Sequence, residues 1–387
     1  MLSCLLKELT LEKVKYSYRE LIFLTNHKIF FKSSTDMCEL RDESVALVIT
    51  SPPYPMIEMW NEVFSSQDPT ISNNPKEGNF DEVFNNMHKL LYKVWDEVVR
   101  ILMPGGIVCI NIGDATKTIN GIFKLYPNHV KIIDYFVNKG FCVLPDIIWR
   151  KQTNAPNKFM GSGMYPPGAY VTFEHEYILI FRKGDKRQFK NVKEKKLRQE
   201  SAYFWEERNI WFSDIWDFKG TGQKLNGNTK RKRSGAFPFE LAYRLINMYS
   251  IKNDIVVDPF LGTGTTTLAA IASERNNVGY EIENAVEPVI RDNIKNSIFF
   301  LNNYIDKKLE KHREFITEQI GQNKSKLYQS RYHDFYVKTR QETEIIINKL
   351  ESIEEIDTNI YNASYTYHPT FNKNHKKNET LIKALSD

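Results

Sequence analysis

Cysteine is scarce in this chain of 387 residues, and its four cysteines are scattered at Cys4, Cys38, Cys109 and Cys142. No two of them have the CxxC spacing of a redox or zinc site, and no other residues show metal-ligand spacing. Three of the four lie in or near apolar runs, which favours buried, reduced thiols and a cytoplasmic protein. The sequence therefore predicts no metal centre.

Long hydrophobic runs are also missing. No stretch of about eighteen apolar residues is present, so no membrane span is predicted. The first eight residues lack a basic segment followed by a long apolar core, so they do not predict a signal peptide. The hydrophobic share of 41% and charged share of 26% are those of a globular protein. The length allows one large α/β domain with insertions, or two domains.

Short apolar runs alternate with amphipathic segments along the chain. Val45–Thr50 predicts a buried strand, and Phe80–Leu102 shows the clearest helical spacing of apolar residues. Residues 61–79 are rich in Asn, Ser, Pro and Gly, which predicts a long loop. The alternation indicates an α/β fold with a mainly parallel sheet and helices on both faces. Further strands are expected over His27–Lys32, Ile107–Ile112, Phe141–Trp149, Tyr177–Phe181, Asp254–Phe260 and Val278–Ile282, and further helices over Pro127–Asn138, Pro238–Tyr249 and Thr265–Ser273.

A stiff turn, Ser51-Pro52-Pro53-Tyr54, follows the strand that ends at Thr50. Two consecutive prolines have fixed φ and no backbone N–H, so the chain leaves the strand extended. The carbonyls of Ser51 and Pro52 are then free to accept hydrogen bonds, beside the flat ring of Tyr54. This arrangement suits a planar base that carries an exocyclic amine. A proline-rich strand exit with a packed tyrosine is the alternative interpretation.

A second motif, the glycine loop Asp258–Thr266, follows another predicted strand. A phosphate-binding loop would need a lysine after its last glycine, but Thr265 follows Gly264, and a dinucleotide fingerprint would need a third glycine at Thr267. The remaining candidate is a loop for S-adenosyl-L-methionine in which Asp258 faces the ligand. Glu281, which ends the next predicted strand, can bind both ribose hydroxyls. A glycine turn with two surface acids is the alternative. Because both motifs follow strand carboxyl ends, they are expected to line one cleft.

The segment from Arg182 to Arg233 is basic and rich in aromatic residues. Its 52 residues contain 16 Lys and Arg against 7 Asp and Glu, a net charge of +9, whereas the whole chain carries +5. A basic segment with interspersed aromatic residues suits a polyanion. A solvated insertion is the alternative interpretation. The densest basic cluster consists of Lys230, Arg231, Lys232 and Arg233.

Two motifs in this order, about 200 residues apart, resemble those of the amino-methyltransferases of DNA, specifically the cytosine-N4 members with the permuted order called β. The resemblance covers roughly residues 27–300. It implies a Rossmann-like, S-adenosylmethionine-dependent methyltransferase fold with a mainly parallel seven-stranded sheet and one antiparallel strand. Ser234-Gly235 departs from the many relatives that carry His or another residue there.

The resemblance also implies roles for individual residues. Asp36 resembles the acid near the adenine of the cofactor, and Phe237-Pro238 resembles the motif that completes the methionine side of the pocket. The implied catalytic residues are Ser51, Pro52, Pro53 and Tyr54. The implied cofactor-binding residues are Asp36, Phe237, Pro238, Asp258, Pro259, Phe260, Gly262, Gly264, Thr265, Thr266 and Glu281.

The resemblance divides residues 27–300 into a catalytic half (27–182), a target-recognition region (183–233) and a cofactor half (234–300). The residue pattern outside this range predicts a helical lead (1–26) and a helical C-terminal extension (301–387). The implied partner is double-stranded DNA, contacted by Lys230, Arg231, Lys232 and Arg233. A cognate restriction endonuclease is a further implied partner.

The residue types suggest a reaction. An exocyclic amine is a poor nucleophile, and the Ser51 hydroxyl with the Pro52 carbonyl can accept both of its hydrogens. The base must leave the duplex, at a cost of a few kcal/mol that stacking on Tyr54 offsets. Carbon-5 methylation needs a cysteine nucleophile after a proline, and none of the four cysteines follows one. Ser51 favours cytosine N4, since adenine-N6 enzymes usually carry Asp there. An adenine-N6 enzyme, an RNA amino-methyltransferase and a non-catalytic DNA-binding protein on this fold remain alternatives.

Overall fold

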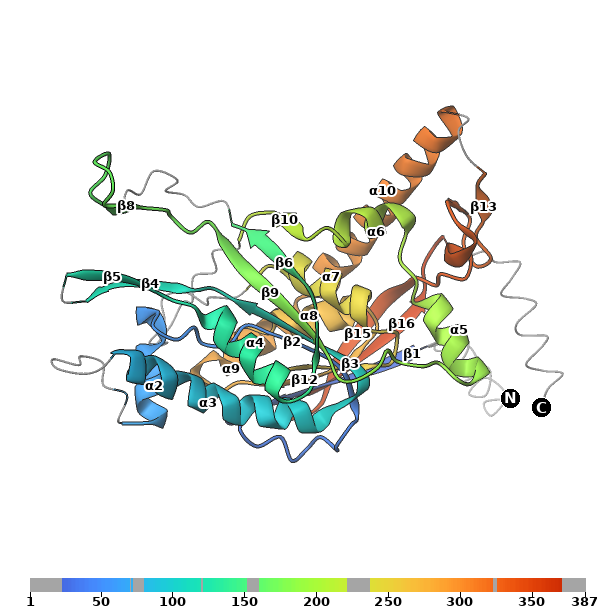
Figure 1. Cartoon of the computed structure of the whole chain (residues 1–387). Helices are drawn as coiled ribbons and strands as arrows, with labels where there is room; N and C mark the ends of the chain where they lie inside the picture. Colours follow the sequence, from blue (N-terminus) through green and yellow to red (C-terminus); the bar gives the residue numbers. More distant parts are fainter. Residues whose placement is uncertain are drawn as a thin grey trace, which may run out of the picture.

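A ten-stranded sheet forms the centre of the computed structural model, which describes residues 23–69, 71, 80–119, 121–151, 160–220, 237–322 and 326–370 (Figure 1). The strand order is β10-β6-β9-β3-β2-β11-β12-β1-β16-β15. The strands are β1 (Phe23–Phe30), β2 (Val45–Thr50), β3 (Leu102–Ile112), β6 (Cys142–Arg150), β9 (His175–Arg182), β10 (Ile215–Asp217), β11 (Ile255–Asp258), β12 (Asn276–Tyr280), β15 (Asn348–Asp357) and β16 (Ile360–Tyr367).

The seven strands from β6 to β1 confirm the expected methyltransferase sheet. Neighbours from β3 to β1 pair in parallel, and β9 alone among the seven runs antiparallel to its neighbours β3 and β6. The sheet continues beyond the expected seven at both edges. β10 pairs in parallel with β6, and the hairpin of β15 and β16 adds to β1.

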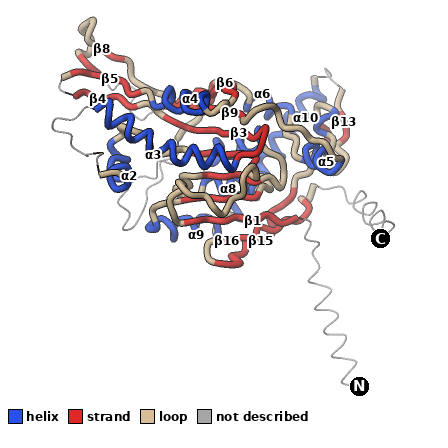
Figure 2. Tube along the Cα trace, turned by 60° about the horizontal axis from the view of Figure 1, so that its bottom comes forward, coloured by secondary structure: helices blue, strands red, loops and turns tan. Residues whose placement is uncertain are grey.

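Helices cover both faces of the sheet, as the alternation of elements predicted. On one face α3 (Phe80–Ile101) and α4 (Asn128–Asn138) pack on side chains such as Val48. On the other face α7 (Phe239–Tyr249), α8 (Thr265–Ala272) and α10 (Ile298–Gly321) pack on side chains such as Leu47. Figure 2 shows α3 lying along its face. Successive side chains of β2 point to opposite faces of the sheet, and helices cover both faces. All six residues of β2 are therefore buried. A third core cluster lies at the side of the sheet near β1, where α9 (Glu287–Lys295) packs with side chains of β1, β15 and β16.

Two β-hairpin arms extend past the carboxyl end of β3 (Figure 1). The first contains β4 (Ala115–Ile119) and β5 (Ile122–Tyr126), and it continues directly from β3. The second contains β7 (Met160–Gly161) and β8 (Ala169–Tyr170), and it leads into β9. β9 is antiparallel to β3, so the start of β9 lies beside the carboxyl end of β3. Both arms therefore extend from the same end of the strands.

The prediction of a loop over residues 61–79 was wrong for residues 61–67, which form a helix. A short helix η1 (Glu58–Trp60) runs into α2 (Asn61–Gln67), and residues 72–79 lie outside the described part of the chain. Trp60 and Phe64 are four residues apart, so both reach the core from one side of the helix. The polar residues between them hid this spacing in the sequence.

The prediction of a helical C-terminal extension was also wrong beyond Gly321. The chain there forms β13 (Tyr328–Gln329), β14 (Tyr336–Val337) and η3 (Arg340–Glu342), followed by the β15–β16 hairpin. Tyr361, Ala363 and Tyr365 alternate along β16 and are buried, which is the period of a strand. The many charged residues of this region hid that alternation. The predicted helical lead over residues 1–26 overlaps β1 from Phe23 onward, and its first 22 residues lie outside the described part.

The basic, aromatic-rich segment packs several of its aromatic side chains into the protein. It forms α5 (Val192–Glu200), α6 (Trp205–Trp211) and β10. Phe204, Trp211 and Trp216 are buried against α7 and α10, so the interpretation of the aromatic residues as a nucleic-acid surface was wrong for these three. The basic cluster Lys230–Arg233 lies outside the described residues.

The predicted burial of the thiols can be compared with the structure. Cys109 is buried, but Cys38 in a turn and Cys142 at the start of β6 are exposed, so the prediction of buried thiols was wrong for these two. Within the described part of the chain, no helix is long and apolar enough to span a bilayer, and no cluster of three or more His, Cys, Asp or Glu side chains is arranged to hold a metal ion.

Candidate active site

The two sequence motifs meet at the carboxyl ends of adjacent parallel strands. β2 ends at Thr50 and β11 ends at Asp258, with Val48 paired to Val257. The Thr50 hydroxyl donates a buried hydrogen bond of 2.7 Å to Asp258 Oδ1. The turn after β2 and the loop after β11 are therefore joined side by side, as the strand pattern predicted.

Asp258 holds the shape of the glycine loop. Its buried carboxylate also accepts hydrogen bonds from the Thr266 hydroxyl (2.5 Å) and from the backbone N–H of Phe260 (3.1 Å). Burial raises the pKa of the Asp258 carboxyl to about 6, although these three donors oppose the shift. Asp258 thus connects β2, the loop and α8 from below, and it does not line the cavity.

The loop needs its glycines because of backbone conformation. Gly262 and Gly264 have φ of 59° and 87°, in the left-handed region. A Cβ built on Gly262 would meet no heavy atom within 4 Å, so this face of the loop is open to a ligand. The Gly262 N–H donates to Glu281 Oε2 (2.9 Å), and Glu281 Oε1 accepts from the Glu283 N–H (2.8 Å). Glu281 is thereby fixed at the cavity wall.

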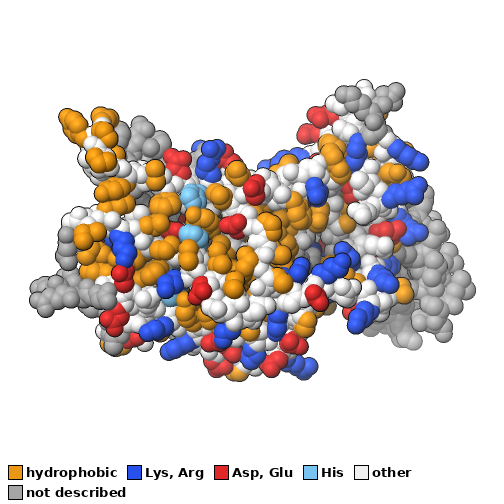
Figure 3. All heavy atoms as spheres, in the orientation of Figure 1, with side chains coloured by type: hydrophobic (Ala, Val, Ile, Leu, Met, Phe, Trp, Pro, Cys, Tyr) orange, Lys and Arg blue, Asp and Glu red, His pale blue; other side chains and the backbone are white. Residues whose placement is uncertain are grey.

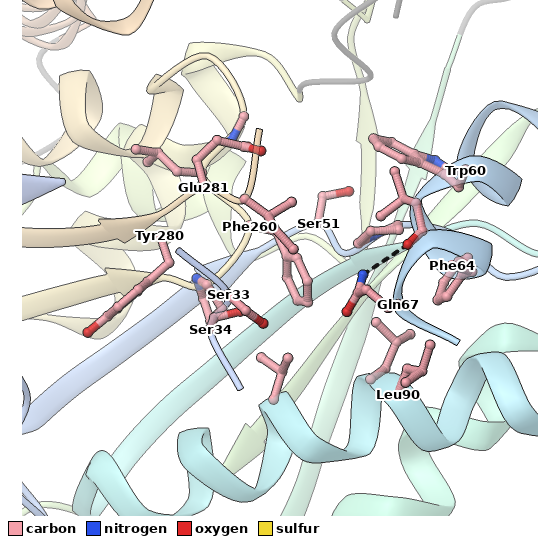
Figure 4. A pocket seen from close by; sticks show the side chains of 18 of the residues that line it. Ser33, Ser34, Ser51, Trp60, Phe64, Gln67, Leu90, Phe260, Tyr280 and Glu281 are labelled. Atoms are coloured by element: carbon pink, nitrogen blue, oxygen red, sulfur yellow. Dashed lines mark hydrogen bonds between the residues drawn. The ribbon is translucent and has the colours of Figure 1, made fainter. Parts of the chain in front are cut away.

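A cavity of about 910 Å³, its mouth included, lies above the two strand ends (Figure 4). Figure 4 shows Ser51 and Phe260 pointing into its middle, between Glu281 on one side and Trp60 on the other. Residues predicted for the site that line this cavity are Ser51, Pro53, Phe237, Pro259, Phe260, Gly262, Thr265 and Glu281.

The other predicted site residues lie outside the cavity lining. Asp36 is exposed, and its carboxylate accepts a hydrogen bond from the Cys38 N–H at 3.1 Å. Ser33 and Ser34, two and three residues earlier, line the cavity instead. The remaining residues of this group also do not line the cavity, and they are Pro52, Tyr54, Pro238, Asp258, Gly264 and Thr266.

Sequence reasoning missed one whole wall of the cavity. Trp60, Phe64 and Gln67 from η1 and α2 face the loop across the cavity, and Leu90 and neighbouring residues of α3 form its floor (Figure 4). The spacing of Trp60 and Phe64 was the available signal, but nothing local indicated that this face points toward the glycine loop. Further lining residues that were not predicted are Lys32, Val63, Leu91, Val94, Leu261, Tyr280 and Ile282.

A polar network surrounds the hydroxyl of Tyr54. Tyr54 Oη donates to Glu176 Oε2 (2.9 Å), accepts from Asn111 Nδ2 (2.9 Å) and lies 3.1 Å from Ser51 Oγ. Asn111 Nδ2 also donates to Glu176 Oε2 (2.7 Å), and Lys151 forms an ion pair with Glu176 Oε1. Burial, followed by repulsion from the Glu176 carboxylate, raises the pKa of Tyr54 well above its usual range. The sequence offered no motif for this network, because its members come from the turn after β2, from β3, from β9 and from the residue that follows β6.

The ring of Tyr54 packs against the backbone at the end of β3. A Cβ built on Gly113 would lie 3.0 Å from Tyr54 Cε2, which is tighter than nine in ten real Cβ contacts. A side chain at position 113 would therefore displace the ring. Gly113 and the polar network together hold Tyr54 in one orientation beside Ser51.

Comparisons with known proteins agree with this geometry. The chain matches the family model described as DNA methylase over residues 45–292. It is 52% identical over 347 residues to the Type II methyltransferase M.MthZI of Methanothermobacter thermautotrophicus, covering 88% of this chain and 95% of the relative. It is also 52% identical over 281 residues to the Type II methyltransferase M.MjaI of Methanocaldococcus jannaschii, covering 70% of this chain and 91% of the relative.

Solved structures show the same fold. TTHA0409 of Thermus thermophilus, a candidate DNA modification methylase crystallised with S-adenosyl-L-methionine, is 30% identical with a TM-score of 0.53, covering 69% of this chain and 93% of its own. The cytosine-N4-specific PvuII DNA methyltransferase, at 18% identity and a TM-score of 0.50 over 74% of this chain and 94% of its own, shares the fold. These comparisons support S-adenosyl-L-methionine as the cofactor, and the chain belongs to the DNA methylase family.

Proposed function

We propose that the protein transfers a methyl group from S-adenosyl-L-methionine to the exocyclic N4 of a cytosine that has rotated out of double-stranded DNA. The observation that carries this proposal is that Ser51, at the end of β2, lines the same cavity as Gly262 and Glu281. One cavity thus offers a turn suited to an amine beside a loop suited to the methyl donor. The extensive similarity to two Type II methyltransferases supports site-specific modification within a restriction system.

The cofactor end of the cavity fits S-adenosyl-L-methionine. When bound, the cofactor supplies a methyl group already activated on a sulfonium, so no metal and no covalent enzyme intermediate are required. Glu281 would accept hydrogen bonds from the ribose hydroxyls, and the open face of Gly262 leaves room for a ligand against the backbone. Phe260 and the apolar side chains of α3 exclude water from this end. Asp258 acts indirectly, by holding the loop.

The base end of the cavity prepares the amine. The Ser51 hydroxyl and the Pro52 carbonyl would accept hydrogen bonds from the two N–H groups of the exocyclic amine, so that its lone pair is directed at the methyl group. The new N–C bond would form as the sulfonium C–S bond breaks, and the methylated amine would then release one proton to solvent. The ring of Tyr54, which lies beside Ser51 and just outside the cavity lining, supplies a stacking surface for the base and offsets part of the few kcal/mol needed to unstack it. Positioning and electrostatics then account for the rate.

The choice of cytosine over adenine rests on Ser51, and an adenine-N6 methyltransferase is the second candidate. The deciding experiment incubates the protein with S-adenosyl-L-methionine and unmethylated duplex DNA, digests the DNA and identifies the modified nucleoside by mass. N4-methylcytosine is expected. N6-methyladenine would replace the cytosine assignment. No methylated nucleoside in DNA, with methylation of RNA in a parallel reaction, would support the RNA alternative.

A non-catalytic DNA-binding protein on this fold is separated by ligand binding. Titration with S-adenosyl-L-methionine should give saturable binding, whereas a degenerate copy of the fold should give none. A cognate restriction endonuclease is the expected cellular partner. DNA treated with the active protein should resist that endonuclease at the shared site, while DNA treated with a Tyr54→Ala variant should be cut.

A further inference from the structure

The hydrogen-bond directions around Tyr54 suggest a role for residues that the motifs do not include. Glu176 is in an ion pair with Lys151, and such a carboxylate only accepts hydrogen bonds. The single hydrogen of the Tyr54 hydroxyl is therefore donated to Glu176 at 2.9 Å. Asn111 strengthens this direction, because its amide nitrogen donates both to Tyr54 Oη and to Glu176 Oε2.

This arrangement determines where the Ser51 hydrogen lies. Ser51 Oγ is 3.1 Å from Tyr54 Oη, and Tyr54 has no second hydrogen to donate. The Ser51 hydroxyl must then donate to Tyr54, which leaves its oxygen lone pairs as acceptors at the cavity. Asn111 is oriented at some cost, since within the described part of the chain its buried Oδ1 has no hydrogen-bond partner.

We propose that Glu176 is a positioning residue for methyl transfer, which acts through Tyr54 to keep the Ser51 oxygen an acceptor for the amine of the substrate base. Lys151 and Asn111 hold the Glu176 carboxylate in place from two other sides. The inference rests on the proposed function and adds to it the group that orients the serine. Glu176 itself is separated from the base by two hydroxyls.

The test replaces Glu176 with glutamine, which keeps the size of the side chain. A carboxamide can donate to Tyr54 Oη, so the Tyr54 hydrogen can turn to Ser51 and the Ser51 hydrogen can turn to the cavity. We expect kcat to fall by about tenfold or more, with the KM for S-adenosyl-L-methionine unchanged. Glu174→Gln is the matched control, because this exposed carboxylate lies two residues earlier and should leave kcat unchanged.

A double-mutant cycle distinguishes orientation from general damage. Tyr54→Phe removes the linking hydroxyl but keeps the ring, and it should lower kcat to a similar extent. The double variant Tyr54→Phe/Glu176→Gln should then be no worse than either single variant, since both remove one path. If the losses of kcat in the two single variants multiplied in the double variant, this inference would be overturned while the proposed function stood. An unchanged kcat in Glu176→Gln would have the same consequence. A wild-type protein that transfers no methyl group would overturn both this inference and the proposed function.

A different observation concerns the two arms. Met164 and Tyr165 at the tip of the β7–β8 arm are 82% and 80% exposed, and Ile122 at the tip of the β4–β5 hairpin is 70% exposed. Figure 3 shows hydrophobic side chains gathered at this end of the molecule. The tip between β7 and β8 is closed by hydrogen bonds from the Ser162 N–H to the Gly168 carbonyl (2.9 Å) and from the Tyr165 N–H to the Ser162 carbonyl (3.3 Å).

The arms are attached to each other and to the catalytic turn. Phe123 of the hairpin stacks on Tyr170 of the other arm, with ring centroids 4.1 Å apart. The hairpin begins just after Gly113, against which the Tyr54 ring packs, and the second arm ends just before Glu176. Exposed apolar side chains on an ordered hairpin lose little further entropy when they bind.

We propose that these arms bind double-stranded DNA around the target base, with Met164 and Tyr165 entering the duplex where the base has left it. Apolar side chains that enter a base step are a recurrent means of unstacking DNA. The arms extend from the edge of the sheet that carries Ser51, so a duplex there would present its rotated base to the cavity. This inference also rests on the proposed function, because it names the surface that receives the same substrate.

The test is the double variant Met164→Ser/Tyr165→Ser, measured for duplex affinity and for methyl transfer. We expect duplex affinity to fall about tenfold. Methyl transfer should fall on paired DNA but less on a duplex with a mismatch at the target base, where unpairing is already easy. Ile356→Ser on β15 is the control, because this side chain is 55% exposed on the outermost strand, which β2, β11, β12, β1 and β16 separate from β3.

The outcomes separate the two proposals. Unchanged duplex affinity and an equal loss on paired and mismatched DNA would overturn the role of the arms. A dimeric wild type that becomes monomeric in the variant, with DNA affinity retained, would do the same, because the tips would then join two copies of the chain. A wild type that binds duplex DNA without methylating it would contradict the proposed function, and duplex affinity would still decide the role of the arms.

Discussion

The glycine loop at residues 258–266 and the aromatic segment at residues 203–218 both pack beside the sheet, but they differ in which groups they turn toward the protein and which toward open space. The loop turns its backbone toward open space at Gly262 and keeps its buried carboxylate, Asp258, underneath. The aromatic segment turns two of its three tryptophans inward, and Trp216 is 1% exposed. One region presents a surface for a ligand, and the other completes the core.

The aromatic segment is held by contacts within the protein. Phe204 stacks on His312 of α10 at 3.7 Å between ring centroids, and Arg244 of α7 lies 5.2 Å from the Trp216 ring. Some of the basic residues are also used internally, since Arg187 forms an ion pair with Asp254 at 2.6 Å. Residue type therefore indicates what a segment can bind, but the direction of its side chains decides whether it does.

The largest expected effect tests the aromatic side of this comparison. Trp216→Ala should lower the free energy of unfolding by about 3–5 kcal/mol, because it leaves a cavity in the core. Duplex affinity of the folded variant should be unchanged. Urea unfolding and DNA titration at low temperature measure the two quantities. Phe212→Ala in the same segment is the control, since Phe212 is 43% exposed and should cost much less. Full stability with weakened DNA binding would restore the segment as a DNA surface.

The loop side of the comparison can be tested through pH. The pKa of Asp258 is about 6 in the folded protein, against about 3.9 in an unfolded chain. Folding therefore favours the protonated carboxyl. Its contribution to stability is full below pH ~4 and is lost as the pH rises to about 6. This change amounts to at most about 3 kcal/mol.

Asp258→Asn removes the titrating group and so provides the measurement. The unfolding free energy of the wild type minus that of the variant should become smaller as the pH rises from 4 to 7. The wild type thus loses stability relative to the variant over this range. Chemical unfolding at several pH values gives this difference. A difference that does not vary with pH would show that Asp258 does not titrate as its burial implies.

The catalytic turn should respond in turnover and not in cofactor affinity. Tyr54→Ala removes both the stacking ring and the hydroxyl, and we expect kcat to fall about 100-fold. Affinity for S-adenosyl-L-methionine should be unchanged, because Tyr54 does not line the cavity. Tyr54→Phe keeps the ring and should lose less. Unchanged turnover in Tyr54→Ala would remove Tyr54 from the proposed role.

Cofactor affinity should depend on Glu281 and very little on Asp36. Glu281→Gln keeps an acceptor for the Gly262 N–H but weakens the bonds to ribose hydroxyls, so the Kd should rise about tenfold. Asp36→Asn is the matched control, and we expect less than about a twofold change, because Asp36 is exposed outside the cavity. Calorimetric titration measures both. An unchanged Kd in Glu281→Gln together with a raised Kd in Asp36→Asn would place Asp36 in the cofactor site and contradict the assignment of Glu281.

The smallest effect concerns the basic cluster Lys230–Arg233, which lies outside the described residues. Replacing one of these four residues with glutamine should weaken duplex binding a few-fold. It should also reduce the slope of log affinity against log salt by about one if that side chain contacts a phosphate. Titrations at several salt concentrations supply the slope. An unmoved slope in all four variants would separate this cluster from the DNA backbone.

The sequence predicted the central elements well because their signals are local. β2 has the predicted bounds, and α3 and α4 end within one or two residues of theirs. The strand–turn motifs at Ser51 and Gly262 were placed correctly at one edge, since parallel strands end together. The α2 wall, the β15–β16 hairpin and the buried Trp216 were not predicted, because their polar or charged neighbours obscured the period of the apolar residues.

The sequence by itself determined the two turns, the mainly parallel sheet and the family to which the chain belongs. These follow from short patterns of proline, glycine and strand-forming residues, which act over a few residues. Only the tertiary structure decided which side chains face the cavity, which aromatic residues fill the core, and that Glu176, Asn111 and Lys151 gather around Tyr54. Those contacts join distant segments, and their formation depends on packing across the whole sheet.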